Sequence, residues 1–304
     1  MIDIKTNGLS WLEPSDINFY GFHGPRNNTA IINSIVEYNK NYAYRLENFK
    51  ANTIKKYDKS VAKLSEHGHS KIEGFFNESQ KKSLLNIRDQ INDLVDRNEN
   101  LKMRTDSMAF INQPLVNLSG LNDIVFDDRL IKIATKYFGC MPGFGSIAVR
   151  KSFVGPTPPD SNQRFHRDYN SLVKMMKFAI YLNDVDEDGG PFTYVEGSNK
   201  KLFNDWWKFH YMNDEDIESV YGSDSIKYLP ANFGDLLMAN TKGFHKGQKP
   251  VARERIAMHF TYLIHPEMEG YDKVPKEKRF QISEDYYKSM PDWKKPATDF
   301  LLKV

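Results

Sequence analysis

Helix-spaced apolar positions dominate the first part of the chain. Within residues 28–64, which contain neither proline nor glycine, Ile32, Ile35 and Val36 recur at the spacing of one helical face. The rest of this segment is rich in lysine, asparagine and tyrosine. The pattern predicts a helical N-terminal extension over residues 1–67.

Two further helices have boundary signals of their own. Asn77 can cap a helix start, because Gln80 stands at the third helical position, as a capping box requires. The apolar stripe that follows consists of Leu84, Ile87, Ile91 and Leu94. The segment DDRLIKIATKYFG, residues 127–139, predicts a second helix, and Gly139 suits the position just beyond its end.

The pattern changes after Gly139. Short runs rich in β-branched and aromatic residues follow, separated by turns that contain glycine and proline. These runs are 145–154, 177–185, 191–195, 235–240 and 255–263. Strands this short, with such turns, favour a β-sandwich or barrel over a parallel α/β sheet. We therefore predict a mainly β fold with flanking helices.

Residues 198–232 form an insertion between two predicted strands. The insertion is partly helical in pattern and carries an aromatic cluster that includes Trp206, Trp207 and His210. Insertions of this length are often lids or binding loops. Two interpretations stay open: the cluster closes over a substrate, or it is a helix that packs on the sandwich. Residues 271–304 are predicted to form a helical tail packed on the core.

Composition limits the possible partners. The chain has 304 residues, 40% of them hydrophobic, and its 42 basic and 40 acidic residues leave a net charge of +2. Such a chain can bury a large core, and its charge calls for neither a nucleic acid nor an anionic membrane. The single cysteine, Cys140, excludes an internal disulfide. No apolar run suits a secretion signal or a membrane span. We expect a cytoplasmic protein, and homo-oligomerisation stays open.

Candidate chemistry begins at the stretch RFHRDYN, residues 164–170. Residues two apart in a strand point to the same side, so His166 and Asp168 can direct a nitrogen and an oxygen at one point. A lone triplet of this kind is weak evidence. A third ligand would come from the end of a distant strand, and His245, which follows the run 235–240, is the natural candidate. Two imidazoles and one carboxylate leave three adjacent positions on a metal open, as in non-haem iron oxygenases.

The predicted strand 255–263 indicates what can fill the open positions. One face of it carries Arg255, Ala257, His259 and Thr261. A buried arginine needs a carboxylate partner, preferably through two parallel hydrogen bonds. 2-Oxoglutarate satisfies both needs, because its 2-oxo acid end chelates a metal while its far carboxylate binds the arginine, and O₂ takes the third position. Arg253 has the same parity as Arg255, so parity cannot choose between them. Thr193 is a further candidate for a contact with the cosubstrate.

Some neighbouring residues have plainer interpretations. His259 is favoured as a core histidine over a contact with substrate or cosubstrate. Only one of Arg150 and Lys151 can face inward, and a surface role is favoured for both. Asn183 is expected to be a turn residue.

The order and spacing of these features resemble the phytanoyl-CoA dioxygenase-like family of Fe(II)/2-oxoglutarate-dependent oxygenases. The likeness covers roughly residues 68–266. Its blocks are GHSKIEGFFNESQKKSLLNIRDQI, DDRLIKIATKYFG, FHRD, YLNDVDEDGGPFTYVEGSNK, FGDLLMANTKGFHKG and RIAMHFTY. The resemblance implies a double-stranded β-helix, a jelly roll of the cupin-like kind, over residues 68–270.

The resemblance also implies roles for individual residues. It makes iron ligands of His166, Asp168 and His245. Arg255 corresponds to the arginine that binds the distal carboxylate of 2-oxoglutarate, with Arg253 as the alternative. One position departs from the family, since many relatives have a serine where this chain has Gly247. The carboxylate of Asp168 implies hydroxylation or a related C–H oxidation, because related halogenases have a small residue at that position.

The leading hypothesis is an Fe(II)/2-oxoglutarate-dependent dioxygenase that consumes O₂ and hydroxylates, or otherwise oxidises a C–H bond of, a small-molecule substrate. Succinate and CO₂ would be its coproducts. One alternative is a zinc or other divalent-metal enzyme on a cupin-like scaffold. Another is a non-catalytic binding protein, against which the intact ligand set argues. The identity of the substrate stays open.

Overall fold

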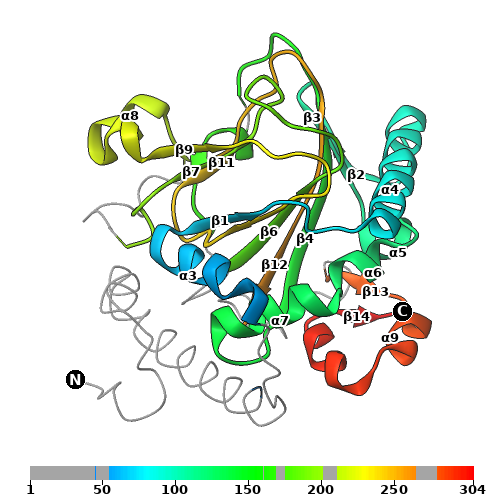
Figure 1. Cartoon of the computed structure of the whole chain (residues 1–304). Coiled ribbons are helices and arrows are strands. Elements are labelled where there is room, and N and C mark those ends of the chain that lie inside the picture. Colours follow the sequence, from blue (N-terminus) through cyan, green and yellow to red (C-terminus); the bar gives the residue numbers. More distant parts are fainter. Residues whose placement is uncertain (1–44, 46–54, 160, 169–174, 201–210, 265–278) are drawn as a thin grey trace, which may run out of the picture.

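Two antiparallel β-sheets face each other, and helices cover the outside of the larger one (Figure 1). The computed structural model describes residue 45 and the ranges 55–159, 161–168, 175–200, 211–264 and 279–304. Within these ranges the sheets are built from strands far apart in sequence, so the fold depends on non-local pairing. No helix in the same ranges is long and apolar enough to cross a membrane.

The larger sheet has seven strands in the part of the chain that the structure describes. In spatial order they are β1 (His69–Ile72), β10 (Leu236–Ala239), β6 (Met176–Tyr181), β12 (Arg255–Leu263), β4 (Gly143–Ser152), β3 (Met108–Ile111) and β2 (Leu101–Arg104). Strand β12 lies at the centre, paired with both β4 and β6. Its central place brings its inward side chains close to those of two neighbouring strands.

The smaller sheet has five strands in the described ranges. They are β8 (Tyr211–Met212), β5 (Phe165–His166), β11 (His245–Gly247), β7 (Phe192–Val195) and β9 (Ile226–Leu229). Strands β8 and β9 both lie within the predicted insertion and pair with β5 and β7. The insertion therefore contributes to the sheet and is not a bare connection.

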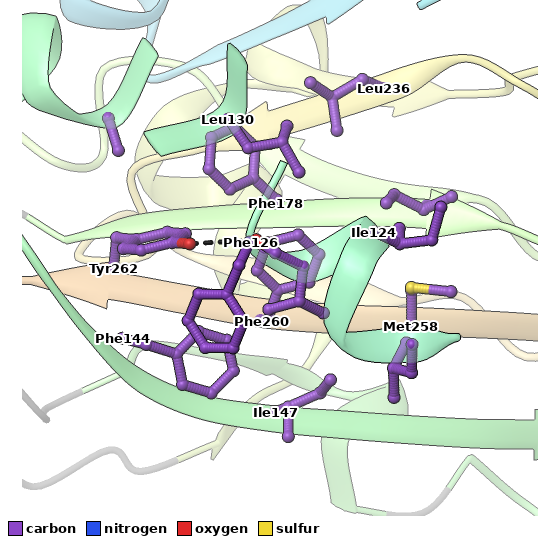
Figure 2. Packing of buried hydrophobic residues seen from close by; sticks show 14 of the residues in the cluster. Ile124, Phe126, Leu130, Phe144, Ile147, Phe178, Leu236, Met258, Phe260 and Tyr262 are labelled. Atoms are coloured by element: carbon purple, nitrogen blue, oxygen red, sulfur yellow. Dashed lines mark hydrogen bonds between the residues drawn. The ribbon is translucent and has the colours of Figure 1, made fainter. Parts of the chain in front are cut away.

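The side chains of β12 alternate between two environments, as the sequence predicts. Ile256, Met258, Phe260 and Tyr262 join the main hydrophobic cluster on the helix-covered side of the larger sheet. Figure 2 shows Met258, Phe260 and Tyr262 of this face. They lie in one cluster with Ile124, Phe126 and Leu130. The hydroxyl of Tyr262 donates a hydrogen bond of 3.0 Å to the backbone carbonyl of Val125. Burying these large side chains, at about 2 kcal/mol each, fixes which face of β12 turns inward.

A smaller cluster fills part of the space between the two sheets. Its members from the larger sheet are Ala179, Tyr181, Leu237, Ala239 and Ala257. Phe192 and Tyr194 join it from β7 of the smaller sheet. Contact between the inner faces of two antiparallel sheets, with helices outside, confirms the predicted jelly roll.

The start of one helix and the end of another coincide with signals read from the sequence. They are α3 (Asp58–His67), α4 (Glu78–Arg97), α5 (Pro114–Asn117), α6 (Leu121–Val125), α7 (Asp128–Phe138), α8 (Asp214–Tyr221) and α9 (Glu284–Ser289). Short 3₁₀ turns lie at η3 (Lys55–Tyr57), η4 (Ser161–Gln163), η6 (Ser223–Ser225) and η9 (Asp292–Thr298). Asn77 and Gln80 form the predicted capping box of α4. Gly139 ends α7 with a φ of 76°, a left-handed conformation that glycine adopts without strain.

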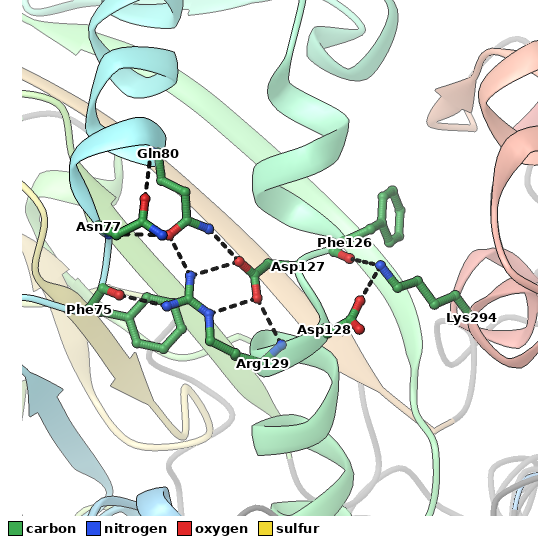
Figure 3. A network of polar contacts seen from close by, with 8 residues as sticks. All are labelled: Phe75, Asn77, Gln80, Phe126, Asp127, Asp128, Arg129 and Lys294. Carbon is green, nitrogen blue, oxygen red and sulfur yellow. Dashed lines mark hydrogen bonds and ion pairs between the residues drawn. The ribbon is translucent and has the colours of Figure 1, made fainter.

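A polar network ties the starts of α4 and α7 together (Figure 3). Arg129 donates to both carboxylate oxygens of Asp127, at 3.0 and 2.7 Å. The same guanidinium donates to the backbone carbonyl of Phe75 at 2.8 Å and to the side chain of Gln80 at 2.7 Å. Arg129 thus links the start of α7 to the start of α4 and to the backbone at Phe75.

The two ends of the chain are described only in part. Of the predicted extension over residues 1–67, the structure describes Arg45 and residues 55–67, and most of 28–64 lies outside the described residues. Helix α3 buries Val61 and Leu64 in the main cluster. At the C-terminus, helix α9 and the η9 turn occur where helical structure is expected, and a short parallel pair, β13 (Gln281–Ile282) with β14 (Leu302–Lys303), joins them.

Candidate metal and cosubstrate site

The three residues proposed as metal ligands lie together on the inner side of the smaller sheet. His166 and His245 stand opposite each other in the pairing of β5 with β11, and their ring centroids are 4.4 Å apart. The backbone N–H of Asp168 donates to the carbonyl of Thr241 at 2.9 Å, which holds the aspartate beside β11. One ligand atom from each of the three lies within 4.8 Å of the others. Strand pairing thus joins the predicted histidine–aspartate pair to the distant histidine.

Both imidazole rings are oriented by backbone carbonyls. Nδ1 of His166 lies 2.8 Å from the carbonyl oxygen of Arg164, and Nδ1 of His245 lies 3.0 Å from that of Gly243. A carbonyl oxygen can only accept, so each Nδ1 carries the proton and each Nε2 keeps its lone pair. This is the arrangement that metal-binding histidines use.

The charge states of the three residues suit a divalent cation. Burial lowers the pKa of His166 to about 4 and lowers that of His245 well below its ordinary value. Both rings are therefore neutral near pH 7. Burial opposes the charge of Asp168, but Lys177 and the two histidines outweigh it and hold the pKa of Asp168 below its usual value. Two neutral nitrogens and one carboxylate oxygen converge on the same point.

Lys177 lies beside this group and was not identified from the sequence. Its Nζ is 2.5 Å from Oδ2 of Asp168 and 3.5 Å from Nε2 of His245. The lysine belongs to β6, opposite Thr261 in the register with β12. That register turns Lys177 toward the interior of the larger sheet, and the facing of the two sheets places its ammonium group against the aspartate.

Arg255 faces the interior, whereas Arg253 does not. The guanidinium of Arg255 is 1% exposed and donates to the carbonyl of Gln248 at 2.9 Å and to the hydroxyl of Ser152 at 3.3 Å. The side chain of Arg253 is 61% exposed and forms an ion pair with Asp186. Geometry therefore separates two arginines that parity could not.

The surface position predicted for Arg150 is wrong. Arg150 stands opposite Ala257 in the pairing of β4 with β12 and is 5% exposed, so it shares the inner face with Arg255. Its neighbour Lys151 points the other way, toward Glu254 at 3.1 Å. The ten-residue strand β4 is buried on both faces over much of its length, so its pattern alone could not show which residue turns inward.

A cavity of about 580 Å³ opens beside the metal-ligand group. Its lining includes Ser146, Lys177, His259 and Thr261 from the inner face of the larger sheet. His259, favoured as a core histidine, lies at the cavity wall with its ring 6.4 Å from that of Phe192. The lining is rich in hydrogen-bonding groups.

The remaining predicted residues lie elsewhere. Thr193 stands opposite Lys246 in the pairing of β7 with β11, on the face that turns away from His245. Its hydroxyl lies 3.3 Å from a backbone carbonyl in its own strand region. The side-chain oxygen of Asn183, which follows β6, accepts a hydrogen bond of 2.9 Å from the N–H of Ile256 in β12, which agrees with a turn role. The predicted lid residues are outside the described part of the chain, namely Trp206, Trp207 and His210.

Comparisons with known proteins agree with this geometry. The family model described as Phytanoyl-CoA dioxygenase (PhyH) matches residues 59–250. No curated protein matches the chain significantly. Among solved structures, the epimerase SnoN of nogalamycin biosynthesis, in complex with Fe³⁺, alpha ketoglutarate and nogalamycin RO, aligns with a TM-score of 0.55. That alignment has 12% identity and covers 68% of this chain and 83% of SnoN.

A second similar structure is the non-haem alpha ketoglutarate dependent carbocyclase SnoK, also from nogalamycin biosynthesis. It aligns with a TM-score of 0.51 and 16% identity, over 72% of this chain and 85% of SnoK. At such identities the two structures show a shared fold. The family match spans well over half of the sequence and includes all three candidate ligands. The chain therefore belongs to the phytanoyl-CoA dioxygenase family, within the iron- and 2-oxoglutarate-dependent oxygenases.

Proposed function

We propose that this protein uses Fe(II), 2-oxoglutarate and O₂ to hydroxylate a small, polar molecule at a C–H bond. One observation carries the proposal. His166, Asp168 and His245 converge on the inner side of one sheet, and the buried guanidinium of Arg255 faces the same interior from the other sheet. A metal site and an anion site that share one interior are what a chelating dicarboxylate requires.

The residues present fit the metal. Each histidine has its Nδ1 proton engaged by a backbone carbonyl, so Nε2 of His166 and Nε2 of His245 would hold the iron together with a carboxylate oxygen of Asp168. Three protein ligands on one side leave three neighbouring positions for small molecules. Lys177 would compete with the metal for Asp168, because both cations interact with the same carboxylate.

The cosubstrate would lie between this group and Arg255. The distal carboxylate would pair with the guanidinium, and the 2-oxo acid end would point to the three ligands. Iron with this cosubstrate supplies the oxidising power for C–H oxidation, with succinate and CO₂ as coproducts. The protein orients both ends and keeps water away, because Phe192 stacks on His245 with ring centroids 5.4 Å apart.

The cavity beside the ligands supports a polar substrate. Ser146 and Thr261 share a hydrogen bond of 2.8 Å at its wall, and His259 and Lys177 add further donors. A pocket of this size, about 580 Å³, suits a molecule of metabolite dimensions. Hydroxylation is proposed because Asp168 supplies a carboxylate ligand; SnoN and SnoK, named as an epimerase and a carbocyclase, show that the same fold supports other outcomes.

The test is spectroscopic. Metal-free protein is prepared without oxygen, then given Fe(II) and 2-oxoglutarate, and the visible metal-to-ligand charge-transfer band is recorded. We expect the band in the wild-type protein and its loss in His166→Ala. Succinate release then serves to screen polar substrates. Tight zinc binding with no band for iron and 2-oxoglutarate would overturn the proposal.

A further inference from the structure

Two arginines, not one, face the interior near the proposed cosubstrate. In the pairing of β4 with β12, Arg150 stands opposite Ala257 and Arg255 stands opposite Ser152. The two arginines are therefore diagonal neighbours on the same face, close enough for long side chains to meet. They are 5% and 1% exposed. Two buried like charges at this spacing repel each other and need a compensating anion.

The described part of the chain supplies no such anion. Nε of Arg150 and Nε of Arg255 are both buried without a hydrogen-bond partner. Arg255 donates only to the neutral oxygens of Gln248 and Ser152. Arg150 has an aromatic contact, with its guanidinium carbon 5.8 Å from the ring centre of Phe110, and no carboxylate within ion-pair distance among the described residues. Burial, with the charge of Arg255, lowers the pKa of Arg150 to about 9, which agrees with an uncompensated pair.

Gly247 explains how both guanidiniums fit. A Cβ atom at this position would lie 2.5 Å from Nη2 of Arg150 and 3.0 Å from Nη2 of Arg255. A contact of 2.5 Å is far inside van der Waals separation, so any side chain here would push Arg150 away. Gly247 is the position at which many relatives have a serine. In this chain the glycine and Arg150 go together, because the space that a serine would fill is occupied by a guanidinium.

We propose that Arg150, Arg255 and Gly247 form a two-arginine carboxylate pocket that holds the distal end of the cosubstrate. This inference rests on the proposed function and deepens it, since it adds a second cation to the site of Arg255. Arg150 would add its charged donors to those of Arg255. The pocket therefore binds a dicarboxylate tightly enough to be measured without any metal, because two charge-assisted contacts replace one.

The experiment uses the metal-free, full-length protein and glutarate, a dicarboxylate that lacks the 2-oxo group and so probes the arginine end alone. Binding is measured by isothermal titration calorimetry for the wild type, Arg150→Met, Gly247→Ser and Lys151→Met. We expect Arg150→Met and Gly247→Ser to weaken glutarate binding by at least about tenfold. Lys151→Met is the matched control, because it removes a charge from the next residue, on the opposite face of β4, and should leave glutarate affinity unchanged.

A second variant separates charge from geometry and guards against misfolding. Arg150→Lys keeps the charge but loses the planar donor pair, and it should recover part of the lost affinity. Equal affinity of the wild type and Arg150→Met for glutarate would overturn the inference, as would absence of glutarate binding to the wild type. The proposed function is judged separately by the charge-transfer band and succinate release, so the two failures can be told apart.

Discussion

The molecule places arginines in two opposite settings, one half-buried beside a carboxylate and one buried with no carboxylate beside it in the described ranges. Arg129, at the start of α7, has its donors directed at Asp127, Gln80 and the carbonyl of Phe75, all within 3.0 Å (Figure 3). Arg150, between the sheets, has no carboxylate partner among the residues that the structure describes. The pKa values shift in opposite directions: the hydrogen bonds that Arg129 donates to Asp127 raise the pKa of Arg129, and burial beside Arg255 lowers that of Arg150.

The difference separates a structural role from a binding role. A charge whose partners are all in the chain stabilises the fold and has nothing left to offer a ligand. A buried charge without such partners costs free energy of folding, and this cost is recovered when an anion binds. Arg129 therefore belongs to the scaffold, and the Arg150–Arg255 pair belongs to the site.

The largest expected effect comes from Arg255→Met. Removing this guanidinium takes away the proposed partner of the distal carboxylate, at a cost of about 2–3 kcal/mol, which is roughly a 100-fold rise in the KM for 2-oxoglutarate. Thermal stability should change little, because the variant also removes one of two repelling buried charges. Steady-state succinate release against 2-oxoglutarate concentration, with a melting curve for each protein, measures both. An unchanged KM would place the cosubstrate elsewhere.

Arg129→Met should show the reverse. It leaves Asp127, Gln80 and the carbonyl of Phe75 without a donor, so the free energy of unfolding should fall by about 2–3 kcal/mol. The KM for 2-oxoglutarate should stay at the wild-type value at temperatures where the variant is folded. Urea unfolding and the same kinetic assay test the two statements. A variant with normal stability but a raised KM would break the contrast between scaffold and site.

Sequence patterns predict most of the scaffold because its signals are local. The capping pair at Asn77, the glycine end at Gly139 and the alternation within 255–263 depend on residues close to one another in the chain, and the structure confirms all three. The grouping of His166 with His245 was also predicted, from the ligand types and the expectation that distant strand ends meet.

The interior charges could not be predicted in the same way. Whether Arg150 or Lys151 turns inward depends on the register of β4 with β12, and both strands are buried over much of both faces. Lys177 meets Asp168 only because two sheets fold onto each other. The space that Gly247 leaves has meaning only once Arg150 is placed against it. Such contacts join residues far apart in the chain, so the periodicity of apolar residues along the sequence does not predict them.

Lys177 combines features of both settings, and its replacement should have a smaller effect, on metal affinity. It has a carboxylate partner, but that partner is Asp168, which the metal needs. Lys177→Met should raise the affinity for a divalent metal several-fold, because it removes both a competitor for the carboxylate and a like charge. Titration of metal-free protein with Co(II), compared with Lys177→Arg as the charge-retaining control, measures the change. Weaker binding in Lys177→Met would mean that the lysine holds Asp168 in its ligating position.

The smallest effect is a pH dependence that belongs to the scaffold alone. Burial disfavours the charge of Asp127, but the hydrogen bonds from Arg129 outweigh it and hold its pKa below the ordinary 3.8. Below about pH 4 the unfolded chain takes up a proton at this residue while the folded protein does not, so acid lowers the free energy of unfolding. Above about pH 5 the contribution of Asp127 to stability is present in full.

In Arg129→Met the decrease in the free energy of unfolding between pH 5 and 3 should be smaller than in the wild type, by roughly 1 kcal/mol. Arg150→Met should keep the wild-type slope, because no carboxylate pairs with that arginine in the described residues. Urea unfolding at each pH measures the slopes, and equal slopes in wild type and Arg129→Met would show that Asp127 owes its low pKa to something other than Arg129.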